Sequence, residues 1–280
     1  MAVRMGEQTP PGPERLAGLT ENETWRQALR DVPREWFVPE RAWATPMGAA
    51  PSYWIDRATD PQPWYEAVYS DSTIVTQIED GGTDLTEESA RSANRFTSSN
   101  SAPSNVTSFL ELLDTYDKDR VLEIGTGTGW TTGLLSARLG AENITSVEVD
   151  EQVAKQARVN LERVGYMPNL ITGDGEKGHP GGAPFDRIHV TCGVRKVPYT
   201  WVEQTRPGGI IVLPWMPGLG GYQVKLTATN DGAVGRFTGN CGYMMMRSQR
   251  PTNTPIADDD RESHPGLIHA ASITRVRDVR

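Results

Sequence analysis

Three glycines at alternate positions follow a short apolar run near the middle of the chain, where residues 121–130 read VLEIGTGTGW. Glycine allows a tight turn and a close approach of the backbone to a ligand, because it has no Cβ atom. A dinucleotide-binding turn places its third glycine one residue later. The spacing here is instead typical of the turn that holds the amino-acid end of S-adenosylmethionine (SAM). The expected SAM contacts in this segment are Glu123, Gly125, Thr126, Gly127 and Gly129.

Two acidic residues end the next two apolar runs. Glu148, in the segment SVEVD, lies at the end of the second expected strand, where an acidic side chain can accept hydrogen bonds from both hydroxyls of a ribose. The alternative for Glu148 is a helix cap, a role that Asp150 fits better. Asp174, followed by Gly175, can hydrogen-bond an adenine amino group, and its alternative is an ordinary loop residue. Because ligands bind at the carboxyl ends of parallel strands, these features together predict a site for SAM and for its product, S-adenosylhomocysteine.

Short apolar runs and helical stretches alternate around these residues. The expected strands are Val121–Gly125, Ile144–Asp150, Leu170–Asp174, Phe185–Thr191 and Ile210–Trp215, with helices at Trp130–Leu139 and Glu151–Val164. Strands that alternate with helices of this length form βαβ units and a parallel sheet. A hairpin of Tyr222–Thr229 and Ala233–Thr238 follows, around Asn-Asp-Gly. We therefore predict an α/β, doubly wound, Rossmann-like sheet that carries the SAM site over residues 116–247, and the family resemblance given below implies that it is a SAM-dependent methyltransferase sheet.

The chain outside this sheet is predicted to be mostly irregular. We expect a flexible tail over residues 1–18 and a C-terminal extension over residues 248–280. Residues 32–64, dense in Pro and Trp, predict an irregular coat on the main domain, with a peptide-binding groove as the alternative. Residues 79–102 predict a polar loop with at most one helical turn near Glu87.

Two helices are expected in the same N-terminal part. Glu23–Asp31 is amphipathic, and Asn22 or Thr24 can cap it. Asn105–Asp114 places its apolar residues on one helical face. Together with the irregular stretches, these helices make residues 19–115 a candidate substrate-recognition segment.

Composition argues against several classes of function. The chain has 28 Lys and Arg against 36 Asp and Glu, a formal charge of −8, which disfavours nucleic-acid binding through phosphates. Two cysteines, Cys192 and Cys241, and four histidines show no zinc-binding pattern, so no metal is expected. No apolar run approaches the ~20 residues of a membrane span, and residues 1–16 lack the apolar region of a signal peptide. We expect a cytoplasmic protein without a membrane partner, and its oligomeric state stays open.

The sequence resembles the protein-L-isoaspartate (D-aspartate) O-methyltransferases from about residue 24 to residue 230. The resemblance rests on VPREWFVP at 32–39, VLEIGTGTGW, GDG at 173–175, APFD at 183–186, RPGG at 206–209 and GYQ at 221–223. The sequence is also similar to a divergent branch of this family, whose members are found beside pathways for ribosomally made peptides, including graspetides and lanthipeptides. Members of that branch have a longer C-terminal region, which implies that residues 248–280 are a truncated remnant of it.

The resemblance also implies a substrate site. The family loop Gly-Gln-Thr-Ile-Ser-x-Pro corresponds to TSSNSAP at residues 97–103, which places Ser99 on the family's Thr and Ser101 on its Ser. It implies that Ser101 and Ser99 are catalytic and hold the reacting carboxylate. Further substrate contacts are expected from Ser98, Asn100, Thr191 and Cys192. From residue types alone, residues 98–101 are equally a solvated loop, and Cys192 is a small buried thiol.

Three functions follow from the resemblance. The first is methylation of an Asp carboxylate in a ribosomally synthesised precursor peptide, after which the ester closes to an aspartimide. The alternative is a repair methyltransferase for isoaspartyl residues in proteins. A methyltransferase-like binding module without chemistry is the third. The expected partner is accordingly a peptide or protein that carries Asp or isoaspartate.

Overall fold

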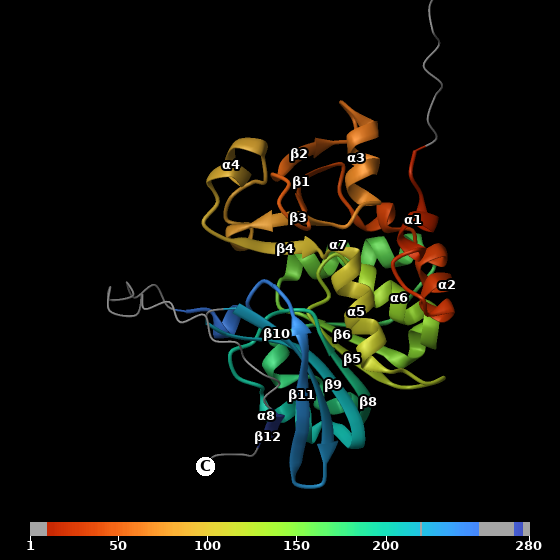
Figure 1. The fold of residues 1–280 in the computed structure, drawn as a ribbon, viewed down its shortest axis with the longest axis vertical. Helices are drawn as coiled ribbons and strands as arrows, with labels where there is room; N and C mark the ends of the chain where they lie inside the picture. Colours follow the sequence, from red (N-terminus) through yellow and green to blue (C-terminus); the bar gives the residue numbers. More distant parts are fainter. Residues whose placement is uncertain (1–9, 219, 252–271, 277–280) are drawn as a thin grey trace, which may run out of the picture.

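The computed structural model describes residues 10–218 and 220–251 and the backbone of residues 272–276. The chain forms one sheet of eight strands and one of four, and the smaller sheet lies at one end of the larger (Figure 1). Most of the predicted C-terminal extension, and residues 1–9 of the predicted tail, lie outside the described residues. Among the helices that the structure describes, none has the length and apolar character needed to cross a membrane.

The large sheet contains the five predicted strands and the predicted hairpin. Its strands are β5 (Val121–Ile124), β6 (Ile144–Glu148), β7 (Asn169–Thr172), β8 (Phe185–Val190), β9 (Thr205–Gly218), β10 (Gly220–Thr229), β11 (Gly232–Asn240) and β12 (Ser272–Val276). Their order is β12-β11-β10-β9-β8-β5-β6-β7. Strands β5 to β9 are parallel, while β10, β11 and β12 are antiparallel. The α/β Rossmann-like prediction is confirmed, with the addition that the sheet is mixed.

The order of the strands places a crevice at β5. Strand β5 pairs with β6 on one side and with β8 on the other, so the chain winds in opposite directions from this strand. Ligands of open α/β sheets bind at such a switch point, outside the carboxyl ends of the strands. The glycine turn begins directly after β5, at that end of the sheet.

Successive residues of β5 enter two different cores, because side chains alternate across a strand. The helices beside the sheet are α2 (Glu23–Asp31), α5 (Pro103–Leu113), α6 (Trp130–Leu139), α7 (Glu151–Arg163) and α8 (Tyr199–Glu203). Val121 packs into the core that α2, α5 and α6 cover. Leu122 and Ile124 pack into the core on the other face, together with Trp201 of α8.

The predicted caps are present. Asn22 accepts hydrogen bonds from the backbone N–H groups of Thr24 and Trp25 at the start of α2. Asp150 accepts from Gln152 and Val153 at the start of α7. Asp150 is therefore the capping acid, which leaves the neighbouring Glu148 available for another role.

The predictions for residues 32–64 and 79–102 are wrong in their main feature, because these residues form regular structure. The small sheet has the order β2-β1-β3-β4. Its strands are β1 (Arg41–Pro46), β2 (Tyr53–Asp56), β3 (Ser72–Ile78) and β4 (Phe96–Asn100), and the helices beside them are α3 (Pro61–Val68) and α4 (Glu87–Ser92). The part of the prediction that holds is the packing of aromatic residues, since Trp64 is fully buried in the main core.

The prediction of a loose tail is also wrong for the residues just before α2. Helix α1 (Pro13–Ala17) buries Leu16 and Ala17, and Leu16 belongs to the main core. The remaining short turns are η1 (Arg34–Phe37), η2 (Glu79–Gly81), η3 (Ala141–Asn143), η4 (Gly175–Lys177), η5 (Pro180–Gly182) and η6 (Arg247–Gln249).

Candidate functional site

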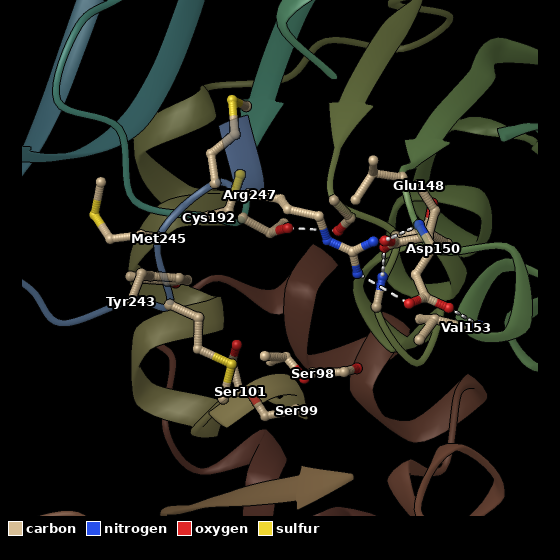
Figure 2. Close-up of a pocket in the computed structure, with 18 of the residues that line it drawn as sticks. Ser98, Ser99, Ser101, Glu148, Asp150, Val153, Cys192, Tyr243, Met245 and Arg247 are labelled. Carbon is tan, nitrogen blue, oxygen red and sulfur yellow. Dashed lines mark hydrogen bonds and ion pairs between the residues drawn. The ribbon is translucent and has the colours of Figure 1, made fainter. Parts of the chain in front are cut away.

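A cavity of about 690 Å³ opens at the carboxyl ends of the parallel strands. Three separate parts of the chain line it. The glycine turn and the strand ends form one wall, the small sheet with residues 96–101 forms a second, and residues 242–248 with Arg250 form a third. In Figure 2, Ser98, Ser99 and Ser101 lie on one side, Glu148 and Asp150 on another, and Tyr243, Met245 and Arg247 come from the C-terminal segment. The cavity therefore brings together all the predicted substrate residues and all the predicted cofactor residues except Glu123 and Gly129.

The glycine turn has the backbone shape that its sequence predicts. Gly125, Gly127 and Gly129 all have positive φ angles, of 97°, 55° and 89°. A Cβ atom at Gly125 would collide with the hydroxyl of Thr191. Gly129 does not line the cavity, because it faces α7, where a Cβ atom would lie 3.3 Å from the side chain of Leu161. Gly129 thus permits close packing of the turn rather than cofactor contact.

Glu148 lies at the end of β6 with 9% of its surface exposed, and it lines the cavity. Its carboxylate accepts hydrogen bonds from the backbone N–H groups of Gly127 (2.9 Å) and Asp150 (3.1 Å). Burial raises the pKa of Glu148, and these hydrogen bonds only partly oppose that effect. A fixed carboxylate beside the glycine turn can accept hydrogen bonds from vicinal hydroxyls of a ribose.

Asp174 and Gly175 line the same cavity after β7. Asp174 accepts a hydrogen bond from the backbone N–H of Glu176 at 3.0 Å, which fixes the carboxylate at the start of η4. A Cβ atom at Gly175 would lie 2.6 Å from Ile124. A glycine is therefore needed for the close approach of this loop to β5.

Glu123 does not line the cavity, so its prediction as a cofactor contact is not supported. Its side chain is fully buried and accepts hydrogen bonds from Thr132 and from Ser146 (2.7 Å). The hydroxyl of Ser146 lies 2.7 Å from that of Thr126 in the glycine turn. Glu123 consequently stabilises the glycine turn indirectly, through its hydrogen bond with Ser146 and the contact of Ser146 with Thr126.

Ser98, Ser99 and Asn100 lie in β4, and Ser101 follows it; all four line the cavity. The hydroxyl of Ser98 accepts a hydrogen bond from Thr76. The amide of Asn100 donates to the hydroxyl of Thr128 at 3.0 Å, so Asn100 joins the small sheet to the glycine turn. Within the described part of the chain, the hydroxyls of Ser99 and Ser101 make no hydrogen bond. Both hydroxyls can therefore donate to a substrate, and the hydroxyl of Ser98, which only accepts from Thr76, also keeps its own proton for a hydrogen bond.

Arg34 holds these residues in place, a role that the sequence analysis does not predict. Its guanidinium is fully buried and donates to the backbone carbonyls of Ser101 (2.8 Å), Asn100 (3.0 Å) and Ser72 (2.8 Å). It also donates to the Asn100 side-chain oxygen at 2.8 Å. Burial lowers the pKa of Arg34 to about 9, so the group is still charged at neutral pH. The sequence feature that could have pointed to Arg34 is its position within the motif VPREWFVP at residues 32–39.

Thr191 and Cys192 directly follow β8 and line the cavity. The hydroxyl of Thr191 donates to the carbonyl of Ile124 at 3.0 Å and also contacts the carbonyl of Gly125, which ties β8 to the turn. Burial raises the pKa of Cys192 to about 12. The residue is therefore a neutral thiol at physiological pH, and its side chain is partly rather than fully buried.

The C-terminal segment of the cavity wall was missed, because residues 241–250 show no periodicity. Tyr243 packs its ring edge-on against Phe109 of α5, with ring centres 5.2 Å apart. Arg247 forms ion pairs with Asp150 (2.9 Å) and Asp80 (3.1 Å), and Arg250 pairs with Asp80 at 2.6 Å. These contacts fasten the segment to both the small sheet and the cofactor side.

Comparison with known proteins agrees with this geometry. The family model for protein-L-isoaspartate(D-aspartate) O-methyltransferase (PCMT) matches residues 55–246, which include the glycine turn, both acidic residues and β4. The chain belongs to this family. A PCMT-family relative from Methanosarcina mazei, named protein-L-isoaspartate O-methyltransferase, is 37% identical over 139 residues, 49% of this chain and 56% of the relative. A relative of the same name from Thermococcus onnurineus is 43% identical over 141 residues, 48% of this chain and 62% of the relative.

Solved structures show the same PCMT fold. One protein-L-isoaspartate O-methyltransferase superposes with a TM-score of 0.62 at 25% identity, covering 83% of this chain and 65% of the other. A Plasmodium falciparum structure of a putative PCMT in complex with S-adenosyl-L-homocysteine has a TM-score of 0.62 at 13% identity, covering 85% and 99%. The matched part of this chain spans about 56–65% of the length of the first curated relatives. Thr45, Arg34, Arg247 and Arg250 lie outside the residues that the family model matches.

Proposed function

We propose that this PCMT-family chain is a SAM-dependent methyltransferase that esterifies the free carboxylate of isoaspartyl residues in proteins or peptides. The observation that carries the proposal is the single cavity in which Glu148 and the hydroxyls of Ser99 and Ser101 meet. The names of the relatives support the same activity.

The residues present fit SAM. The glycine turn leaves space that a Cβ atom would fill at Gly125. Glu148 offers a buried carboxylate for the ribose, and Asp174 offers one for the adenine amino group. When bound, SAM supplies a methyl group on a positively charged sulfur, and S-adenosylhomocysteine is left as product.

The chain's own residues act by positioning. An ordinary aspartyl carboxyl has a pKa of about 3.9 and is ionised at neutral pH, so no residue has to remove a proton. Ser99 and Ser101 donate hydrogen bonds that hold the carboxylate with an oxygen toward the methyl carbon. The new O–C bond forms as the C–S bond breaks, with its electron pair on sulfur. In the product, the next backbone nitrogen attacks the ester, closes a succinimide and releases methanol.

The test is a methylation assay with purified protein, SAM and two peptides that differ only in an isoaspartyl or an aspartyl linkage. The expected result is a mass gain of one methyl group on the isoaspartyl peptide, with little change on the aspartyl one. Calorimetry with S-adenosylhomocysteine accompanies it. Failure to bind S-adenosylhomocysteine would favour a binding module without chemistry.

A second candidate is methylation of an Asp in a ribosomally synthesised precursor peptide, followed by closure to an aspartimide. The observation that favours it is the hairpin of β1 and β2, which lies largely before the family-matched residues and adds Thr45 to the cavity wall. A dedicated peptide needs such a larger contact surface. Preferential esterification of the aspartyl peptide in the same assay would support this second function.

A further inference from the structure

The cavity extends beyond the serines across one face of the small sheet. Ser99 in β4 is the cross-strand neighbour of Val75 in β3, and Thr73 of β3 is the cross-strand neighbour of Thr45 in β1. Thr73 and Val75 share a face of the sheet, because they are two residues apart. All four of these residues line the cavity. The floor therefore runs continuously from the proposed carboxylate-holding Ser99 to Thr45.

Apolar groups surround this part of the cavity. Val75 is 1% exposed and belongs to a small core with Trp43, Ile78 and Ala90. Phe96 of β4 and Met244 of the C-terminal segment pack against that core and also line the cavity. Methionine adapts its shape to varied apolar partners. The apolar core of the small sheet thus has an open side beside the reacting centre.

The charged side chains among the residues that line the cavity belong to Glu148, Asp150, Asp174, Arg247 and Arg250. Glu148 and Asp174 follow the parallel strands, and Arg247 is paired with Asp150. A charged group that was buried against Thr45, Val75 and Phe96 would exchange its hydration for contact with uncharged side chains, which is unfavourable. An apolar group has no such hydration to lose, and the burial of its surface against these side chains is favourable.

The wall that closes this space is partly outside the family-matched part of the chain. Thr45 precedes residue 55, where the match to the family model begins. The hydroxyl of Thr45 accepts a hydrogen bond from Ser52 at 3.1 Å. This side chain is therefore hydrogen-bonded within its own hairpin and carries no charge that could pair with a charged ligand. Thr45 is therefore the part of this wall that lies outside the family match, whereas Thr73, Val75, Phe96 and Met244 lie within it.

We propose that Thr45, Thr73, Val75, Phe96 and Met244 form a subsite for the side chain of the residue next to the target carboxyl, and that this subsite selects an uncharged aliphatic neighbour. The inference rests on the proposed function and names its substrate class: peptides in which the isoaspartyl residue has Leu or a similar residue beside it. A host peptide with Gly on both sides is methylated more slowly, and one with Glu or Lys more slowly still.

The first experiment measures kcat/KM of the full chain for isoaspartyl peptides that carry Gly, Leu, Glu or Lys at one neighbouring position, in separate series for the preceding and following residue. In one of the two series, Leu is expected to exceed Gly by about tenfold and Glu or Lys by more, the range that one buried apolar group gives. Values within twofold across both series would overturn the subsite while leaving the proposed function intact. No methylation of any peptide, including the Gly host, would instead refute the proposed function.

Two variants locate the preference. Met244→Ala removes an apolar wall and is expected to reduce the Leu-to-Gly ratio at least threefold, whereas Met167→Ala, at an exposed methionine, keeps the wild-type ratio. Thr45→Lys adds a cation and is expected to raise the Glu-to-Leu ratio about tenfold, whereas Thr59→Lys, on the surface, does not. Circular dichroism confirms folding of each variant. A folded Met244→Ala protein with the wild-type ratio would overturn the assignment even if Thr45→Lys failed to fold.

Discussion

Arg247 donates a hydrogen bond to Asp150 at 2.9 Å, and this contact joins the C-terminal segment to the residue that caps α7. Asp150 also donates its backbone N–H to Glu148, the proposed ribose ligand. The same guanidinium lies 3.1 Å from Asp80 in η2. One arginine therefore links the small sheet, the cofactor wall and the segment that closes the cavity.

Replacing this arginine is expected to weaken cofactor binding. Arg247→Ala removes the attachment of residues 242–248 to Asp150, so the wall of the cavity is held less firmly on the cofactor side. We expect the Kd for S-adenosylhomocysteine to rise about tenfold, or ~1.4 kcal/mol, as measured by calorimetry. Arg206→Ala is the control, because Arg206 pairs with Asp186 on the surface away from the cavity. Equal values for the two variants would show that the contact does not hold the site closed.

Glu148 predicts a pH dependence of cofactor binding. Burial raises its pKa above the ordinary value of 4.5, and only the ionised form accepts hydrogen bonds on both carboxylate oxygens. Acidification through the raised pKa therefore protonates the free protein, and log Kd for S-adenosylhomocysteine should rise toward one unit per pH unit. Glu148→Gln should bind weakly with no such slope. Parallel slopes for both proteins would assign the titration to another group.

The raised pKa of Glu148 also affects the stability of the cofactor-free fold, and here acidification is favourable, whereas it is unfavourable for cofactor binding. A carboxyl whose pKa is higher in the folded state than in the unfolded state stabilises the fold below the folded pKa, and this contribution is lost as pH rises above it. At neutral pH the buried charge of Glu148 is thus unfavourable to the cofactor-free fold. Glu148→Gln should raise the free energy of unfolding in urea at pH 7 and should not do so when both proteins are compared well below pH 4.

Ser101 is expected to be needed for chemistry and not for cofactor binding. Ser101→Ala removes one hydroxyl donor from the proposed carboxylate site, and loss of such a donor costs ~100-fold in kcat. The Kd for S-adenosylhomocysteine should stay within twofold of wild type. Ser92→Ala, in the exposed helix α4, serves as control. A Ser101→Ala protein with wild-type turnover would remove Ser101 from the reaction.

Arg34 is expected to carry both stability and geometry. Arg34→Met leaves the buried carbonyls of Ser72, Asn100 and Ser101 without their donor, and each unsatisfied group costs roughly 1–3 kcal/mol. Urea unfolding should show a loss of about 3 kcal/mol, against less than ~0.5 kcal/mol for Arg41→Met at an exposed position. Preserved stability would mean that water replaces the guanidinium.

The parallel strands and their helices were predictable because their signals are local. Trp130–Leu139 was predicted with its observed bounds, and Asp150 has the side chain that a helix start requires. Strand β4 could not be predicted in this way, because Phe96–Asn100 is polar and becomes a strand through pairing with β3. Its regular structure is a tertiary effect.

Two site residues show different reasons for failure. Arg34 contacts Asn100 across 66 positions of sequence, and no local pattern reports such a contact. Glu123 could have been placed correctly from alternation alone, since it shares a face of β5 with Val121, which packs under α2, α5 and α6. The prediction followed the motif and overlooked the direction of the side chain.

Residues 242–248, which form the third wall of the cavity, are synthesised after the residues of the other two walls. A ribosome completes the glycine turn, Glu148 and Asp174 well before it adds Tyr243 and Arg247, so a nascent chain has the parallel strands before it has an enclosed site. Because Arg247 bridges Asp80 and Asp150, the last wall also connects parts that were synthesised earlier. We therefore expect the cofactor site to become enclosed only after Arg247 has been synthesised.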